Sequence, residues 1–125
     1  MSGFDAATLG DLEAARTARI ETSAGTGRPV HLTTIWVVVD SERRVLVRSW
    51  RGERGRWYRE LLANPQGALV IGKKRVAVRA QLASDRQRVE SCSEGLRRKY
   101  AGSRGSLAQM LLPEVLSTTL ELRRL

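Results

Sequence analysis

Short apolar segments separated by tight polar turns are the feature that most limits the folds open to this sequence. The β-branched run 30–39 is followed by a polar stretch and by a second apolar run, 45–50. Residues 68–71 and 75–82 form another such pair around a glycine-lysine turn. Extended segments joined by so short a turn pair as antiparallel hairpins. The sequence therefore predicts two hairpins within one sheet.

Helices and two further strands are predicted around these hairpins. The spacing of apolar residues predicts helices at 8–16 and 56–64, a third after the capping sequence at 84–87, and a helical turn at 107–112 ended by Pro113. Residues 19–22 and 118–124 read as strands. About six mostly antiparallel strands with three to four helices favour a mainly β fold, a barrel or curled sheet flanked by helices. A chain of 125 residues is expected to form one domain, residues 1–125.

The composition excludes several kinds of site. Cys92 is the one cysteine and His31 the one histidine, so neither an internal disulfide nor a multi-ligand Cys/His metal site can form. Cys92 lies on the apolar side of its predicted helix, which is typical of a small core residue. The N-terminus lacks the pattern of a secretory signal, and no apolar run is long enough to span a membrane. We therefore expect a cytoplasmic protein with no membrane partner.

The net charge of +9 would ordinarily suggest nucleic acid or another anionic partner. However, the positive charge is almost entirely arginine, and it is scattered over predicted strands, loops and helices. No continuous basic helix is present in the sequence. Nucleic acid is therefore not the expected partner, whereas a phosphorylated small molecule needs only a local cluster of charge.

Such a cluster lies in the stretch 49–59, between the strand 45–50 and the helix predicted from Arg56. Gly52 and Gly55 allow the backbone to turn tightly and approach a ligand. A helix that begins just after a glycine presents free N–H groups and the positive end of its dipole, which suits a phosphate. The alternative is a solvated basic loop whose aromatic residues fill the core. Arg48 lies between two apolar neighbours on one face of the strand 45–50, so it is either a ligand contact or an outward-facing charge.

With these elements in place, the sequence resembles the flavin-binding split-barrel superfamily of pyridoxamine phosphate oxidase-like proteins. Within it, the closest resemblance is to the domain-of-unknown-function family numbered 2255. The likeness rests on short motifs spread over most of the chain, at 34–38, 45–49, 52–58, 99–100 and 117–120, and on the hairpin after the helix. The segment 55–65 is also similar to deazaflavin-dependent nitroreductases, in which a Trp-Tyr pair opens the helix beside the cofactor phosphate.

The resemblance implies a split β-barrel that forms a homodimer, with flavin mononucleotide (FMN) or a deazaflavin coenzyme at the subunit interface. It also implies hydride transfer to a small acceptor, although the closest family has no assigned reaction and no catalytic residue follows from it. Carried over to this sequence, the phosphate side comprises Arg48, Ser49, Arg51, Arg54 and Arg56. The strand beside the ring carries Thr33, Thr34 and Trp36, and the Gly-Arg turn ends at Arg28. The expected set is completed by Gly52, Gly55, Trp57 and Tyr58.

The sequence departs from the nitroreductase pattern in two ways, and two alternative functions remain open. The loop carries arginines where the nitroreductases typically have lysine, and Glu53 places a negative charge next to any phosphate. Whether the protein is an enzyme is left open. One alternative is a noncatalytic module that uses its basic surface for an anionic ligand or nucleic acid, and the other is a heme- or small-ligand-binding barrel.

Overall fold

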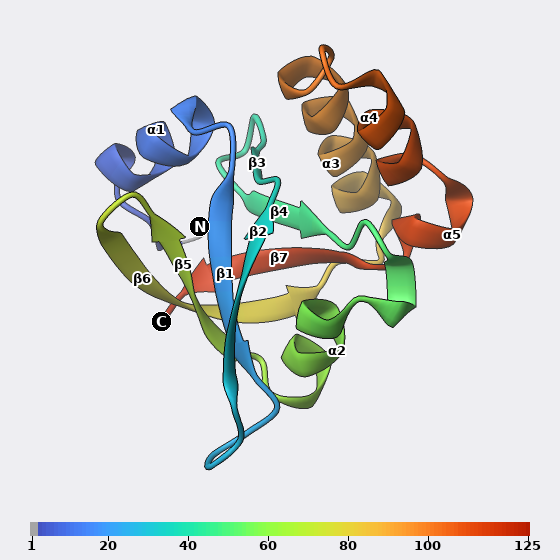
Figure 1. Ribbon diagram of the computed structural model, residues 1–125. Coiled ribbons are helices and arrows are strands. Elements are labelled where there is room, and N and C mark those ends of the chain that lie inside the picture. Colours follow the sequence, from blue (N-terminus) through green and yellow to red (C-terminus); the bar gives the residue numbers. More distant parts are fainter. Residues whose placement is uncertain (1–2) are drawn as a thin grey trace.

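The computed structural model describes residues 3–125, which form one antiparallel seven-stranded sheet with helices packed around it (Figure 1). The strands are β1 (Ala18–Ser23), β2 (Val30–Ile35), β3 (Val38–Val39), β4 (Val45–Arg48), β5 (Gln66–Ile71), β6 (Lys74–Leu82) and β7 (Thr119–Arg124). The helices are α1 (Ala6–Ala14), α2 (Arg56–Ala63), α3 (Arg86–Lys99), α4 (Arg104–Met110) and α5 (Pro113–Leu116), with a 3-10 turn, η1 (Gly52–Arg54). No helix in this part of the chain is both long and apolar enough to cross a membrane.

The strand order β2-β1-β5-β6-β7-β4-β3 makes the sheet a split barrel. Its two edges, β2 and β3, are consecutive in the chain and are separated only by Trp36 and Val37. Three residue steps span at most about 11 Å, so the two edges must come together and the sheet must curl. The predicted split barrel of mostly antiparallel strands is therefore confirmed.

Two apolar clusters lie on opposite sides of the curled sheet. The first fills the barrel, where side chains of β1, β4, β5, β6 and β7 meet α1 and Trp57, Tyr58 and Leu61 of α2. The second lies between β3, β4 and the helices α3 and α4. Val45 and Val47 of β4 enter the first cluster and Leu46 enters the second, while the fourth residue of the strand, Arg48, is also buried.

The largest difference from the predicted elements concerns the run 30–39. The sequence predicts one continuous strand, whereas the structure ends β2 at Ile35 and begins β3 at Val38, on the other edge of the sheet. Apolar periodicity cannot reveal this break, because residues on both sides of it are β-branched and buried. The alternation of apolar residues in 75–82 predicts that Leu82 faces inward, whereas its side chain is 46% exposed at the end of β6.

Local capping also differs from expectation. Asp5 caps α1 by accepting from the Thr8 N–H, three residues before the predicted helix start. Asp85, inside the predicted capping sequence 84–87, caps α3 by accepting from the Arg88 N–H. Pro113, expected to end a helical turn, begins α5 instead, because proline is well suited to the first position of a helix.

Helix α3 is attached to the sheet through a buried arginine of β4. The Arg48 side chain is 1% exposed. Its Nε donates to Thr119 Oγ1 at 2.9 Å, Nη1 to Ser93 Oγ and the Met110 carbonyl at 3.0 Å each, and Nη2 to the Val89 carbonyl at 3.0 Å. Arg48 is thus neither an outward charge nor exposed to a ligand, and burial lowers its pKa.

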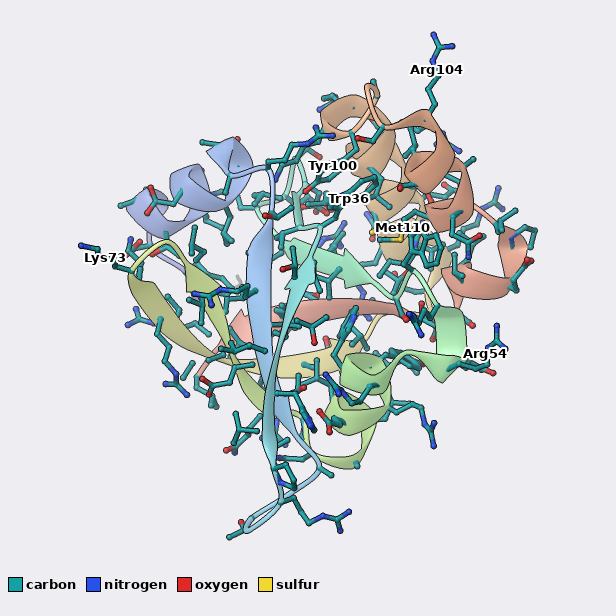
Figure 2. The ribbon with its side chains drawn as sticks, in the orientation of Figure 1. Trp36, Arg54, Lys73, Tyr100, Arg104 and Met110 are labelled. Carbon is teal, nitrogen blue, oxygen red and sulfur yellow. The ribbon has the colours of Figure 1, made fainter. Side chains whose placement is uncertain are left out.

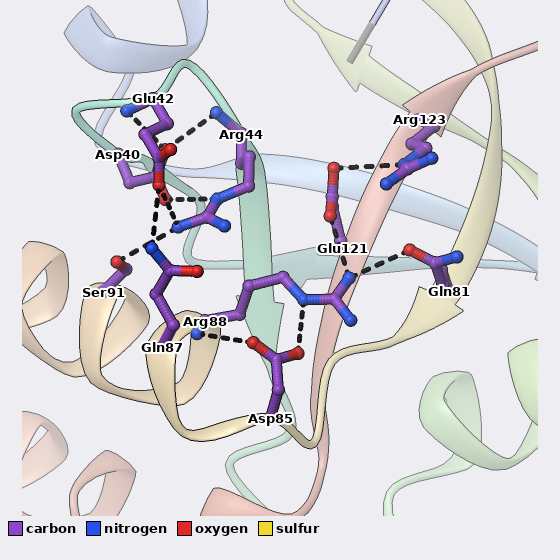
Figure 3. Close-up of polar contacts among 10 residues, drawn as sticks. All are labelled: Asp40, Glu42, Arg44, Gln81, Asp85, Gln87, Arg88, Ser91, Glu121 and Arg123. Carbon is purple, nitrogen blue, oxygen red and sulfur yellow. Dashed lines mark hydrogen bonds and ion pairs between the residues drawn. The ribbon is translucent and has the colours of Figure 1, made fainter. Parts of the chain in front are cut away.

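A second polar connection joins α3 to β7 (Figure 3). Glu121 is 2% exposed, and its carboxylate accepts from Arg88 at 2.9 Å and from Arg123 at 3.2 Å. Arg88 also donates to Asp85 and Gln81. A buried carboxylate is costly unless it is paired and hydrogen-bonded, and here it is both.

Cys92 is buried in the second cluster, as expected for a small core residue. Burial raises the pKa of its thiol to about 11, so the reactive thiolate is disfavoured at neutral pH. We expect the folded protein to resist a thiol reagent such as Ellman's reagent at pH 8, and to react fully once unfolded in guanidinium chloride. Stoichiometric labelling of the folded protein would show that Cys92 is accessible and contradict this packing.

Candidate anion-binding site at the start of α2

The connection between β4 and α2 is shaped by its two glycines. Gly52 has φ +63°, a left-handed conformation that glycine adopts without strain, and its N–H donates to the Ser49 carbonyl at 3.0 Å. Gly55 has the ordinary φ of −62° and is needed for another reason. A Cβ at this position would overlap Ser49 Oγ. The absence of a side chain at Gly55 therefore leaves room for the Ser49 hydroxyl beneath the start of the helix.

Helix α2 begins at this point without a side-chain cap. Its first backbone hydrogen bond to the cap residue runs from the Arg59 N–H to the Gly55 carbonyl, at 3.0 Å. The N–H groups of Arg56, Trp57 and Tyr58 precede that bond, as the first donors of any helix do. They are available to an anion, which the helix dipole also favours at this end.

A pocket of about 460 Å³ opens in front of the helix start. It is formed where the edge strand β2, the end of β4 and the first turn of α2 meet. Its volume is within the range of small-molecule sites, roughly 300–1,000 Å³. The residues that line it are Thr33, Thr34, Ser49, Trp50, Arg51, Arg54, Gly55, Arg56 and Trp57.

Ser49 supplies an unsatisfied polar atom at this pocket. The residue is 0% exposed, and its Oγ is the one buried side-chain polar atom without a hydrogen-bond partner in residues 3–125. The Ser49 backbone is held in place, since its N–H donates to Thr118 Oγ1 at 3.1 Å. An unpaired buried hydroxyl is costly, so the Ser49 hydroxyl points to a missing hydrogen-bond partner.

Three guanidinium groups surround the same pocket. Arg51, Arg54 and Arg56 are exposed, and none forms an ion pair with a carboxylate in the described part of the chain. Other arginines, such as Arg75 and Arg98, do pair with glutamates. Arg54 lies on the outer side of the connection that precedes α2 (Figure 2). The arrangement favours an anionic group bound by unneutralised arginines, free amides and a serine hydroxyl.

The remaining residues expected at the site lie outside this pocket. Trp36 lines a smaller neighbouring cavity of about 200 Å³. Gly52 lines a separate cavity of about 500 Å³ between η1 and the helices α4 and α5, which shares Trp50, Arg51 and Arg54 with the main pocket. Tyr58 is buried in the barrel core, Arg48 is bound to α3, and Arg28 lies in the exposed β1–β2 turn. His31 does not line the pocket either, because its Nδ1 contacts the Glu60 carboxylate at 3.0 Å.

Trp50 is the pocket residue missing from the sequence-derived set. It is 49% exposed and lines both the main pocket and the smaller cavity. Its place in the arginine-glycine stretch was a signal, but apolar periodicity cannot distinguish an exposed tryptophan from a core one. Thr118, which positions Ser49, lies in the closing motif 117–120 and was detectable only through the family resemblance.

The family model for uncharacterised proteins conserved in bacteria, DUF2255, matches residues 8–122. The chain belongs to the DUF2255 family. The match includes every element that forms the pocket. No protein of curated function matches the sequence.

Solved structures similar to this DUF2255 protein share its fold at low sequence identity. A protein from Listeria innocua assigned as a pyridoxamine 5′-phosphate oxidase has a TM-score of 0.62 at 13% identity, over 95% of this chain and 90% of the other. The heme storage protein HutZ from Vibrio cholerae has a TM-score of 0.64 at 15% identity, over 98% of this chain and 91% of the other. An F420-H2 dependent reductase has a TM-score of 0.62 at 12% identity, over 86% of this chain and 94% of the other. These similarities establish the split-barrel fold.

Proposed function

We propose that this DUF2255 protein binds FMN or a deazaflavin coenzyme in the pocket at the start of α2 and acts as an oxidoreductase toward a small acceptor. The observation that carries the proposal is the buried, unpartnered Ser49 hydroxyl beneath Gly55, at a helix start bordered by unpaired arginines. The occurrence of a reductase and an assigned oxidase among proteins of the same fold supports the chemistry.

The residues present fit the phosphate of such a cofactor. The N–H groups at the start of α2 and the Ser49 hydroxyl would donate to the phosphate oxygens, while Arg51, Arg54 and Arg56 would neutralise their charge. Thr33 and Thr34 of β2 also line the pocket, and a threonine hydroxyl would be offered to the polar part of the ligand. The bound cofactor would supply the hydride chemistry, and the protein supplies position and electrostatics.

The test is an absorption spectrum of the freshly purified protein, followed by titration of the cofactor-free protein with FMN and with the deazaflavin coenzyme. We expect saturable binding of one of them. Absence of binding by both would remove the proposal. Salt-dependent retention on nucleic acid without any cofactor signal would favour a noncatalytic module instead, and a heme spectrum would favour a heme-binding barrel.

We further propose that a second copy of the chain covers the edge strand β2. Val30 and Leu32 of this strand are 63% and 49% exposed, next to the pocket residues Thr33 and Thr34. An unpaired apolar edge is normally covered or blunted.

This proposal predicts a homodimer in sedimentation velocity, and Leu32→Arg should convert it to a monomer because charges would be buried in the interface. Leu125→Arg is the matched control, since Leu125 is an exposed leucine at the other end of the chain. A monomeric wild-type protein at micromolar concentration would contradict the proposal.

A further inference from the structure

A second, smaller cavity of about 200 Å³ adjoins the anion-binding pocket. The two share Thr34, Trp50 and Trp57 as walls. We call it the tryptophan cavity, because all three tryptophans of the chain line it. Its complete lining is Thr17, Thr34, Ile35, Trp36, Trp50, Trp57, Ser106 and Met110.

The tryptophan cavity differs from its neighbour in charge. Its lining contains no arginine, lysine, aspartate or glutamate, whereas three arginines line the anion-binding pocket. Indole rings and a methionine thioether favour aromatic ligands. A charged group would lose hydration here without gaining a partner, so the lining disfavours ions.

Two of its aromatic walls are held rigidly. Trp36 stacks on Tyr100 with ring centroids 3.9 Å apart and planes 3° from parallel. The Tyr100 hydroxyl accepts from the Val37 N–H at 3.1 Å and donates to the Arg16 carbonyl at 2.9 Å, which fixes the stack. Figure 2 shows Trp36, Tyr100 and Met110 close together beside α3 and α4. Trp57 is 7% exposed and packs in the barrel core.

The third aromatic wall is at the opening. Trp50 is 49% exposed, and its carbonyl accepts from Gln109 Nε2 at 2.9 Å, which ties this wall to α4. Thr17, Thr34 and Ser106 offer hydroxyl groups at the margin of the cavity. These hydroxyls would suit one polar substituent, such as a carbonyl, hydroxyl or nitro oxygen, on an otherwise apolar ring.

We propose that the tryptophan cavity binds a small, uncharged, planar aromatic compound of one or two rings. An apolar cavity of about 150 Å³ accepts benzene, whereas sites for larger ligands begin at roughly 300 Å³. The size of the cavity therefore limits the ligand to a compact ring system. The role of this aromatic compound as the acceptor of the oxidoreductase reaction rests on the proposed function. Its binding in the tryptophan cavity does not.

The experiment uses 2-naphthol as the probe and the cofactor-free protein. The three indole Nε1–H signals are followed in two-dimensional proton–nitrogen NMR spectra and assigned with single Trp→Phe variants. We expect saturable shifts of these signals during the titration. A titration without saturable shifts would overturn the proposal.

Two substitutions locate the binding. Ser106 is exposed on α4, so Ser106→Phe should fill the cavity without removing a tryptophan and weaken 2-naphthol binding at least tenfold. Ser106→Ala, the matched control, should bind within about twofold of wild type. Trp50→Ala provides a second variant, expected to weaken binding at least fivefold. Wild-type affinity in folded Ser106→Phe, or in folded Trp50→Ala, would contradict the assignment.

The same titrations separate this inference from the proposed function. Arg56→Ala should leave 2-naphthol binding unchanged, because Arg56 lines only the anion-binding side. Binding of FMN without 2-naphthol would refute the tryptophan cavity as a site and leave the proposed function standing. Binding of 2-naphthol without either cofactor would support the cavity and refute the proposed function.

Discussion

Arg48→Met is expected to lower the free energy of unfolding by about 3 kcal/mol, because it leaves buried acceptors on α3, α4 and β7 without their donor. The relief of a desolvated charge offsets part of this loss. The melting temperature should fall by about 10 °C, given the size of the domain. Chemical denaturation and thermal unfolding measure both effects.

Two further variants make this prediction specific. Arg97→Met removes an exposed arginine from α3 and should change stability by less than about 0.5 kcal/mol. Arg48→Lys keeps the charge but cannot reproduce the planar set of donors, so it should also destabilise. If Arg48 instead contacts the cofactor, Arg48→Met would lose binding at nearly wild-type stability, which would contradict the structural role.

The double substitution Arg51→Ala/Arg56→Ala is expected to weaken cofactor binding about 100-fold, while each single substitution weakens it about tenfold. Both side chains line the pocket, and both are exposed, so each is expected to contribute at the lower end of the range for charge-assisted hydrogen bonds. Fluorescence titration gives the dissociation constants. The folded state should be unaffected, because neither side chain is part of the core.

Arg59→Ala is the control for the loss of charge. Arg59 lies on the same helix but outside the anion-binding pocket, so its replacement should change affinity by less than about threefold at physiological salt. Equal effects of Arg56→Ala and Arg59→Ala would indicate general attraction to a basic surface. Unchanged affinity in the double variant would place the cofactor elsewhere.

Local patterns made much of the fold predictable from the sequence. The hairpins around 40–44 and 72–73 and helix α2 follow from alternation, turn residues and helical spacing, all of which act over a few residues. The pocket could be anticipated because its arginines, glycines and serine are nearly contiguous in the chain. Thr33 and Thr34, from a distant strand, were identified through the family resemblance.

Tertiary packing decided what local patterns could not. The break at Trp36 and Val37 exists because the sheet closes there, a property of all seven strands. The sequence around Arg48 suggests a surface or ligand residue. Its hydrogen-bond partners Ser93 and Thr119 are 45 and 71 residues away, so the local sequence cannot reveal them. The exposure of Trp50 depends on the path of the loop between η1 and β4.

The measurement that tests the central claim most directly is the affinity of FMN compared with riboflavin, which lacks the phosphate, and of the deazaflavin coenzyme compared with its phosphate-free chromophore. In the wild-type protein, one phosphorylated form should bind at least about tenfold more tightly than its partner. Gly55→Ala should abolish this preference, because the new methyl group would collide with Ser49 Oγ and displace this hydroxyl, while φ of −62° accommodates alanine. Gly10→Ala, which adds a methyl group in open space on α1, should retain the preference. Equal affinity for both forms in wild type, or an undiminished preference in folded Gly55→Ala, would contradict a phosphate site at the start of α2.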